Sequence, residues 1–485
     1  MHLSLLISNC ISVEYVNILS SYLDIKNSET PDNKDKIIEK LTHEVAVLTN
    51  RNVQLEAELN LYKQRLAKFE ILKNSSNSSI PPSKDENRPA RKSLREKSGL
   101  KSGGQNGHQG STLQMTENPD KIEEMVSDYC KKCGKDLCDV KPNFVYKRQV
   151  VDLPEIKPIY TEYQCFSKKC SCGHDQVPEF PDHVSNYIQY GASVEAAVGY
   201  CSVYQYLPYK RMSELFLHFY NLPISEGTIG NMLERLGQRI QPIYNSLQGA
   251  VAKSKTAVGG DETGVRVNGK KYWAWIWQTA MYTFIAVSES RGKKVIEEFF
   301  PCGFQNAVLV SDRWKAHIST YAKGHQLCIA HLLRDLNYLI ELETTAWAKS
   351  IKTLFKQALE LKRKIPEYSI DDPRVMIIET KLNQLLNENL DKNETPKTLT
   401  FKKSLTAHRN YIFTFLYHED VPPDNNASER GFRNYKVKLK ISGQFKTGHN
   451  TFAKIRSFVE TCKKNKIPIL QALKLVAQIP ILPAE

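Results

Sequence analysis

A patterned stretch between residues 256 and 312 constrains the fold of this 485-residue chain more than any other feature. It consists of a short apolar strand ending in an acid, a turn at Asn268-Gly269, two further strands, a helix and a last apolar strand that also ends in an acid. These elements are expected over Thr256–Asp261, Tyr272–Thr279, Thr283–Ser288, Lys293–Phe300 and Ala307–Asp312. The pattern predicts a mixed α/β domain with an aspartate at the end of its first and fourth strands.

This order of strand, hairpin, helix and strand is what a ribonuclease H-like domain needs, because its first and fourth strands lie side by side. Their terminal carboxylates, Asp261 and Asp312, can then converge on one site. A third acid must come from a later helix, and Glu429 is the best candidate. Asp424 can cap that helix. Helical spacing sets four side chains along one of its faces: Asn425, Asn426, Glu429 and Arg433.

Three carboxylates in such an arrangement indicate Mg²⁺ (or Mn²⁺), because a hard cation takes oxygen ligands. Two ions about 4 Å apart activate the attacking hydroxyl and stabilise the leaving oxygen in a phosphoryl transfer. Each acid taken singly has an ordinary explanation. An aspartate that closes a strand is usually a turn former, and a Glu-Arg pair on a helix usually faces solvent.

Residues Ile37 to Phe69 carry five heptads. The d positions are Leu41, Leu48, Leu55, Tyr62 and Phe69, and the a positions are Ile38, Val45, Asn52, Leu59 and Leu66. Opposite charges at neighbouring g and e positions, such as Arg51 and Glu56, favour a parallel pair of helices, and the polar Asn52 fixes two-strandedness. We therefore expect a coiled coil over 37–72 that makes a homodimer. The alternative is one amphipathic helix packed on its own domain.

Residues 73–120 are expected to form a flexible basic linker. Asn74-Ser-Ser-Asn-Ser-Ser-Ile-Pro-Pro-Ser83 breaks the helix and cannot bury apolar surface. Lys84–Lys101 holds seven Lys or Arg and three Asp or Glu, and the glycine-rich Gly103–Gly110 follows it. Such a stretch either tracks a phosphate backbone or serves only as a solvated tether.

Six of the eleven cysteines cluster between residues 130 and 172, which indicates metal binding rather than disulfides in a chain without an export signal. Two close pairs flank the segments of strand character Val145–Leu153 and Ile159–Cys165: Cys130 with Cys133, and Cys170 with Cys172. Two such pairs at the ends of a hairpin give the thiolate cage of a structural Zn²⁺ site. Reduced, buried cysteines are the alternative. The tight second pair leaves further ligands open: Cys138, Cys165 and His174.

Residues 184–252 are expected to be helical. The expected helices are Val194–Tyr200, Lys210–Tyr220 and Glu226–Leu236. Ser225 is the expected N-cap of the last one. A helix, a short turn and a second helix resemble a helix-turn-helix, whose second helix enters a major groove, but core packing explains a helical pair equally well.

The net charge of +14, from 67 Lys and Arg against 53 Asp and Glu, favours a polyanionic partner. Arg430–Lys466 alone holds eleven Lys or Arg and one acid, whereas a solvated helix face would mix signs. This segment predicts a DNA channel. The residues expected to bind DNA are Arg430, Arg433, Lys436, Lys438 and Lys440. With no bilayer-spanning apolar run and no signal peptide, we expect a cytoplasmic protein without a membrane partner.

Taken in order, the motifs resemble those of transposases of the insertion-sequence-66 family, the DDE type often called transposase C. The resemblance covers most of the chain, from about Leu41 to Pro480. Besides the cysteine module, its landmarks are Asn74–Ser79, Pro81–Ser83, Gly103–Gly110, Gln189–Gly191, Leu207–Arg211, Ser225–Gly230, Gly260–Thr263, Val310–Asp312, Cys328–Arg334 and Asp424–Arg430. No single landmark is specific, but their number and order are.

The resemblance implies the catalytic metal ligands Asp261, Asp312 and Glu429, and the zinc ligands Cys130, Cys133, Cys170 and Cys172. It also implies that His331 and Arg334 support the site or touch DNA, although a packed helix is the alternative. The irregular cysteine spacing departs from the family's pattern and leaves the zinc ligands open. A helical stretch, Glu341–Lys397, is inserted between the second aspartate and the glutamate, as is usual in DDE enzymes.

We therefore expect a dimeric DDE transposase that binds the terminal inverted repeats of its element, cleaves DNA and joins the freed end to target DNA. Its expected partners are double-stranded DNA, a second copy of the chain and small accessory proteins. The alternative is a zinc-containing dimeric DNA-binding regulator with an inactive nuclease-like domain. The expected domains are the coiled coil (37–72), linker (73–120), zinc module (121–183), helical region (184–252), ribonuclease H-like domain (253–437, with an insertion over about 341–400) and basic C-terminal region (438–485).

Overall fold

The computed structural model describes residues 31–70, 73–78, 85, 107, 110, 113–343, 345–389 and 396–480, and within the first range it describes side chains only at 35–59 and 62. The described residues belong to two compact units. The first draws on residues 1–89, 190–206 and 232–485, and the second on residues 90–189 and 207–231. Across the described ranges, no helix is both long and apolar enough to cross a membrane.

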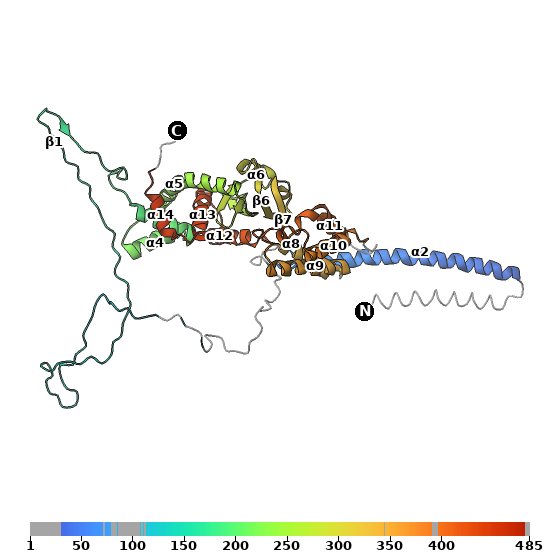
Figure 1. Ribbon diagram of the computed structural model, residues 1–485, viewed down its shortest axis with the longest axis horizontal. Coiled ribbons are helices and arrows are strands. Elements are labelled where there is room, and N and C mark those ends of the chain that lie inside the picture. The colour runs from blue at the N-terminus through green and yellow to red at the C-terminus, as the bar shows by residue number, and fades with distance from the viewer. Residues whose placement is uncertain are drawn as a thin grey trace. The chain divides into compact units, whose positions relative to one another are not determined.

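Helix α2 (Pro31–Glu70) runs without a break through the predicted heptads (Figure 1). Several of its seam side chains are exposed, among them Ile38 at 52%, Val45 at 51% and Leu55 at 46%. Among the residues that the structure describes, this apolar stripe is therefore left largely uncovered. A second helix would bury it in a coiled coil, and that pairing stays a prediction.

A five-stranded mixed sheet forms the centre of the first unit. Its strands are β3 (Val258–Val267), β4 (Lys270–Gln278), β5 (Thr283–Ser288), β6 (Phe304–Ser311) and β7 (Ala322–Leu327). The order across the sheet is β5-β4-β3-β6-β7. The first three strands along the chain are antiparallel, whereas β6 is parallel to β3 and β7 is parallel to β6. The first and fourth strands are therefore neighbours, as the sequence predicts.

The sheet differs from the prediction in two respects. Strand β3 does not end at Asp261 but continues to Val267, because it pairs with β4 around the Asn268-Gly269 turn. Both turn residues have positive φ, as a tight hairpin turn requires. Strand β7 was not predicted, because Lys323, Gly324 and His325 interrupt its apolar pattern.

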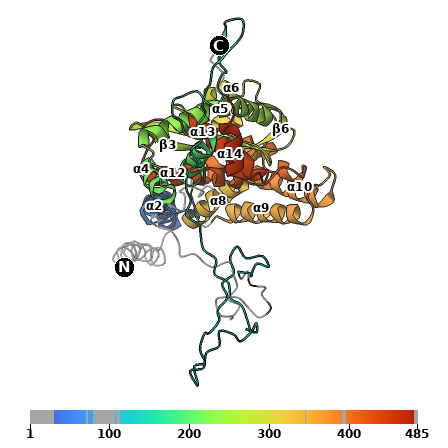
Figure 2. The same ribbon diagram turned by 90° about the vertical axis from the view of Figure 1, so that its left-hand side faces the viewer.

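Helices cover both faces of the sheet (Figures 1 and 2). On one face, Trp277 and Phe284 contact the rings of Phe299, Phe300 and Tyr244. On the other face, α12 contacts β3 and β4, while α13 contacts β5, η1 and α14, and α3 packs against α14. The bounds of these elements are α5 (Glu226–Ala252), α6 (Lys293–Phe299), α7 (Lys315–Ile318), α12 (Asn426–Ser442), α13 (His449–Lys464), α14 (Ile469–Ala477), α3 (Ala192–Gly199) and the π-helix η1 (Tyr200–Tyr204).

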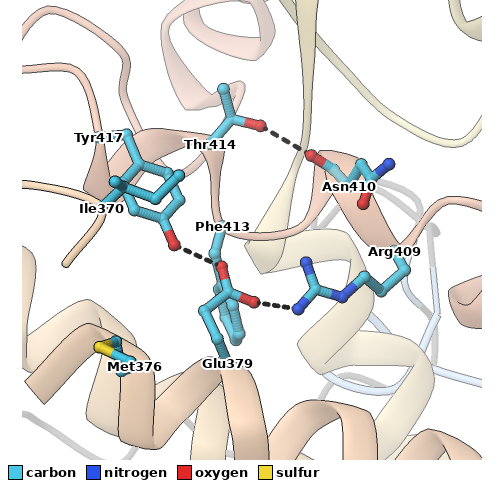
Figure 3. Close-up of a pocket in the computed structure, with 8 residues that line it drawn as sticks. All are labelled: Ile370, Met376, Glu379, Arg409, Asn410, Phe413, Thr414 and Tyr417. Atoms are coloured by element: carbon cyan, nitrogen blue, oxygen red, sulfur yellow. Dashed lines mark hydrogen bonds and ion pairs between the residues drawn. The ribbon is translucent and has the colours of Figure 1, made fainter. Parts of the chain in front are cut away.

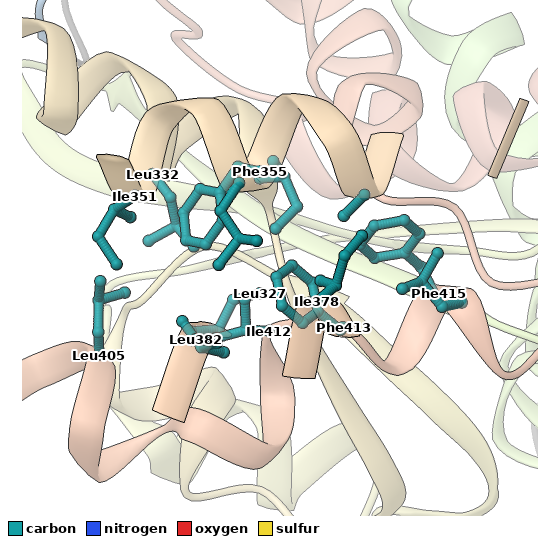
Figure 4. Packing of buried hydrophobic residues seen from close by; sticks show 14 of the residues in the cluster. Leu327, Leu332, Ile351, Phe355, Ile378, Leu382, Leu405, Ile412, Phe413 and Phe415 are labelled. Atoms are coloured by element: carbon teal, nitrogen blue, oxygen red, sulfur yellow. The ribbon is translucent and has the colours of Figure 1, made fainter. Parts of the chain in front are cut away.

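A helical insertion lies between β7 and α12. Its elements are α8 (Ile329–Glu343), α9 (Ala346–Lys364), α10 (Pro373–Asn387), α11 (Pro396–Ala407), η2 (Arg409–Tyr411) and η3 (Thr414–Leu416). Leu332, Phe355 and Phe413 belong to its core, which also includes Val310 of β6 (Figure 4). The insertion returns to the point where it leaves the sheet, since the Ile329 N–H donates to the Pro423 carbonyl at 2.9 Å. The insertion begins with α8 at Ile329, earlier than its predicted start at Glu341.

The second unit holds α4 (Tyr209–Tyr220), the first turns of α5, and a two-stranded sheet of β1 (Lys168–Lys169) and β2 (Asp175–Gln176). Ser225 Oγ accepts the Thr228 N–H at 3.1 Å, which confirms the predicted N-cap. The strands predicted over Val145–Leu153 and Ile159–Cys165 are wrong. These residues are mostly exposed and have no partner strand to satisfy their backbone groups.

Candidate active site

Two aspartates lie on one face of the sheet, one within β3 and the other directly after the end of β6. Strands β3 and β6 are parallel and pair Gly259 with Val310. Asp261 and Asp312 each lie two residues further along the chain, so alternation places both side chains on the face of Gly259 and Val310. The strands themselves are about 4.8 Å apart. The structure thus brings the first two predicted carboxylates together.

The Asp261 carboxyl lies in a poor environment for a negative charge. Burial raises its pKa most, and the nearby Glu262 and Asp312 raise it further, to about 8. Throughout the part of the chain that the structure describes, no ion pair joins Asp261 or Asp312 to Lys, Arg or His. Two adjacent carboxylates without an ion-pair partner form an oxygen donor set that a hard divalent cation fits.

Helix α12 begins directly over this face of the sheet. The buried Asn425 donates from Nδ2 to the Gly260 carbonyl at 2.7 Å, and Gln278 Nε2 donates to Ser428 Oγ at 3.2 Å. A Cβ atom at Gly259 would lie only 2.7 Å from Ser428 Oγ. The sheet and the helix therefore come this close because a glycine occupies the position. Asn425 is the N-cap residue, although the Asp424 carboxylate still accepts the Asn426 N–H at 3.0 Å.

Glu429, the third predicted carboxylate, lies in the first turn of α12 and contacts α8. Its Oε1 is 3.2 Å from Arg334 Nη2 and 3.7 Å from His331 Nε2. Of the residues that the structure describes, no three His, Cys, Asp or Glu are grouped so that they could hold a metal ion. The structure thus places Asp261 next to Asp312, whereas Glu429 forms an ion pair with Arg334. A single centre formed by all three acids stays a prediction.

His331 interacts with one residue of the aspartate pair, Asp312, and with Glu429. Burial lowers the pKa of its imidazole most and Arg334 lowers it further, whereas Asp312 and Glu429 raise it. Two of the predicted acids therefore act on one imidazole. Both residues that the family motif implies as supporting groups, His331 and Arg334, contact Glu429, and Asn425 fastens the start of α12 to the sheet.

A buried ionic network behind the aspartates was missed by the sequence analysis. Glu262 projects to the opposite face from Asp261, where its two oxygens contact His317 Nε2 at 2.7 Å and Arg291 Nη2 at 2.6 Å. Burial alone would raise the pKa of Glu262, but His317 and Arg291 together lower it. The signal was available: an acid next to Asp261 in an alternating strand must face the buried side, where it needs cationic partners.

The basic residues near α12 fall into two groups. Arg430, Arg433 and Lys440 are exposed. Lys438, which was also expected to bind DNA, is instead buried at 9% exposure, and burial lowers the pKa of its amine. The side chain of Lys436 is partly exposed. Further along, Arg456 is buried and donates to the Val203 carbonyl at 2.9 Å, so part of the basic segment serves packing.

Each cysteine pair of the second unit lies in its own tight turn. The Cys130 N–H donates to the Lys135 carbonyl and the Cys170 N–H donates to the His174 carbonyl. Hydrogen bonds from Lys132 and then Cys133 lower the pKa of the Cys130 thiol, and hydrogen bonds from Cys172 lower the pKa of the Cys170 thiol. The structure therefore forms two thiol pairs, but it does not gather them into one cage within the described ranges. The zinc site stays a prediction.

The helical insertion carries a pocket of about 400 Å³ (Figure 3). Inside it, Glu379 accepts a hydrogen bond from Tyr417 at 2.7 Å and pairs with Arg409 at 2.6 Å. Its charge is therefore compensated within the insertion, and none of the three predicted acids lines the pocket. The lining residues are Ile370, Met376, Glu379, Arg409, Asn410, Phe413, Thr414 and Tyr417.

Comparisons with known proteins add independent findings. The model of the Transposase IS66 family matches residues 187–452, and that of a family of unknown function, DUF6444, matches residues 28–114. Among solved structures, the chain is similar to the HTLV-2 integrase catalytic core domain in complex with magnesium (trimeric form), at 11% identity and a TM-score of 0.14, over 30% of this chain and 96% of that one. A likeness this weak supports no conclusion. The curated proteins contain no match.

The fold and the site define a class of mixed α/β proteins that place neighbouring carboxylates on one face of a sheet, beneath the start of a helix. The first family match covers more than half of the chain, including all three predicted acids. The chain belongs to the IS66 family of transposases.

Proposed function

We propose that the chain is a DDE transposase that binds the ends of its element and catalyses metal-dependent DNA strand cleavage and strand transfer. The observation that carries the proposal is the pair Asp261 and Asp312, on one face of the sheet at adjacent parallel strands and without an ion-pair partner among the described residues. Membership of a transposase family supports DNA as the substrate. Strand cleavage and strand transfer go beyond what the family match alone establishes.

Asp261 and Asp312 would hold Mg²⁺ (or Mn²⁺), and Glu429 would complete the ligand set. When bound, the metal supplies a Lewis acid that stabilises charge on the phosphoryl oxygens. The carboxylates orient the reacting groups, and occupancy favours the ionised form of Asp261 over the protonated form that burial favours. Glu429 reaches the pair only when its contact with Arg334 is exchanged, so a shift of α12 or α8 belongs to the proposal.

DNA would lie along the exposed face of α12. Arg430, Arg433 and Lys440 provide cations there, close in sequence to Glu429. Phosphate contacts of this kind position the DNA without reading its sequence. Lys438 is left out of this surface because it is buried. Binding of Zn²⁺ by the cysteine pairs, dimer formation through α2 and small accessory proteins remain parts of the proposal that rest on sequence.

Replacement of Asp261 by Asn tests the proposal. Asp261→Asn keeps the side-chain volume but removes a metal ligand, so DNA carrying the element's ends should still bind while Mg²⁺-dependent cleavage falls by about a hundredfold or more. Cleavage of labelled DNA and its binding are measured with the same preparation. Asp371→Asn, the same change at an exposed residue of the insertion, should leave both unchanged. Wild-type cleavage by the Asp261 variant would refute the assignment.

The second candidate is a zinc-containing dimeric DNA-binding regulator with an inactive nuclease-like domain. The Arg334–Glu429 ion pair favours it, because that contact keeps the third acid away from the aspartates. The cleavage assay separates the two functions. A regulator would bind the DNA but cut nothing in Mg²⁺ or Mn²⁺, whatever residue occupies position 261.

A further inference from the structure

Residues Asn74 to Ser78 form a closed turn within the predicted linker. Asn77 Oδ1 accepts the Asn74 N–H at 2.8 Å, while Asn74 Oδ1 accepts the N–H groups of Ser76 at 2.8 Å and Asn77 at 3.2 Å. The amide oxygens of Asn74 and Asn77 therefore each accept a hydrogen bond from the backbone N–H of the other residue. Ser78 Oγ closes the turn by donating to the Asn74 carbonyl at 2.6 Å. A segment too polar to build an apolar core is held together by its own side chains.

This turn contacts the polar face of α8. Asn77 is only 2% exposed, and its Nδ2 donates to Glu341 Oε2 at 2.6 Å. Asn337 Nδ2 donates in the opposite direction, to the Ser76 carbonyl at 2.9 Å. The ammonium of Lys73 lies 5.8 Å from the centre of the Tyr338 ring. Asn77 thus uses both ends of its amide, one to close the turn and one to bind the helix.

The contacted residues share a face of α8 with Arg334. Arg334, Asn337, Tyr338 and Glu341 follow the i, i+3, i+4, i+7 spacing of one helical stripe. The opposite stripe is buried in the core of the insertion and includes Leu332, Leu336 and Leu339. The turn therefore occupies one end of the polar stripe, and Glu429 is bound at the other end through Arg334. A single helix carries both contacts.

We propose that the Asn74–Ser78 turn is a docking element for α8 and that Asn77 is a positioning residue for Glu429, acting through α8 and Arg334. The inference rests on the proposed function, in which Glu429 must join Asp261 and Asp312. The turn follows the end of α2 at Glu70. Placement of the third carboxylate is thereby linked to the arm that is expected to dimerise.

An isosteric change at the contact tests this role. Asn77→Asp places a carboxylate against that of Glu341, so backbone amides of Ser75 to Ser78 should exchange hydrogen faster in the full-length protein. Cleavage of end DNA in Mg²⁺ should fall about tenfold or more, because a buried hydrogen bond to a charged group is replaced by repulsion. DNA binding should be unchanged. In the double variant Asn77→Asp/Glu341→Gln the new amide can donate to the new carboxylate, and both readouts should recover.

Two further variants keep the test decisive. Asn387→Asp makes the same change at an exposed residue of α10 and should alter neither readout. Asn337→Ala removes the contact with Ser76 without adding charge and should give a weaker form of the Asn77→Asp effect. Unchanged amide exchange in Asn77→Asp would overturn the docking, and faster exchange with normal cleavage would overturn the positioning role. Failure of the wild-type protein to cleave refutes the proposed function, while the exchange readout still judges the docking.

Discussion

At the scale of single residues, the neighbouring acids of β3 have opposite surroundings. Asp261 faces α12, where burial, together with the charges of Glu262 and Asp312, raises its pKa to about 8. Glu262 faces the other side, where His317 and Arg291 lower its pKa. Strand alternation alone separates them. One carboxyl remains available for a cation, and the other binds Arg291 of the loop after β5 and His317 of α7.

Gly259 makes the close approach of α12 possible, and its replacement gives a prediction at this scale. Gly259→Ala should lower the free energy of unfolding by about 1–3 kcal/mol, because the new methyl group meets Ser428 Oγ and Asn425 Oδ1. The midpoint of denaturant unfolding measures the change. Gly264→Ala lies in the same strand with nothing within 4 Å and should not destabilise the fold. Equal losses in the two variants would contradict the proposed contact.

The sequence predicted residues whose placement follows from strand order, and it missed those whose placement depends on distant partners. Asp261 and Asp312 were predicted because parallel neighbouring strands bring them together. The ion pair of Glu429 with Arg334 was not, since it depends on how α12 packs against α8. Asn77 was assigned to a linker because its partner, Glu341, lies far along the chain.

At the scale of elements, α2 presents an apolar stripe that the other described residues largely leave uncovered, and its heptad positions give a prediction. Leu48→Lys places a charge at a d position and should convert the dimer to a monomer. Val47→Lys adds the same charge one residue earlier, at a position outside the seam, and should leave the dimer intact; Val47 is 52% exposed. Sedimentation equilibrium distinguishes the two masses. An equal response of both variants would argue against the seam.

Elements with strong local signals were predicted well. The bounds of β5 agree with the prediction, and the Asn268-Gly269 turn lies where the sequence indicates. The two strands predicted between the cysteine pairs were wrong, because their Val, Ile and Tyr content indicates strand preference but cannot supply a pairing partner. Strand β7 was missed because its pairing with β6, rather than its own pattern, makes it a strand.

At the scale of the whole molecule, the excess of positive charge predicts a salt-dependent interaction with DNA. Arg433→Ala should weaken binding at low salt and reduce the slope of log affinity against log salt by about 0.9, the contribution of one phosphate contact. The slope is measured by titrations at several salt concentrations. Lys356→Ala, which removes an exposed charge of α9, should leave the slope unchanged. An unaltered slope for Arg433→Ala would remove α12 from the DNA surface.

The hydrogen bond between Ile329 and Pro423 fixes the two ends of the insertion to each other. The number of residues between Asp312 and Glu429 therefore does not determine the distance between the two side chains. Helices can be gained or lost between these two residues without changing the distance that the sheet and α12 impose on the acids. An insertion of another size, closed at the same two residues, would therefore leave the geometry of the site unchanged.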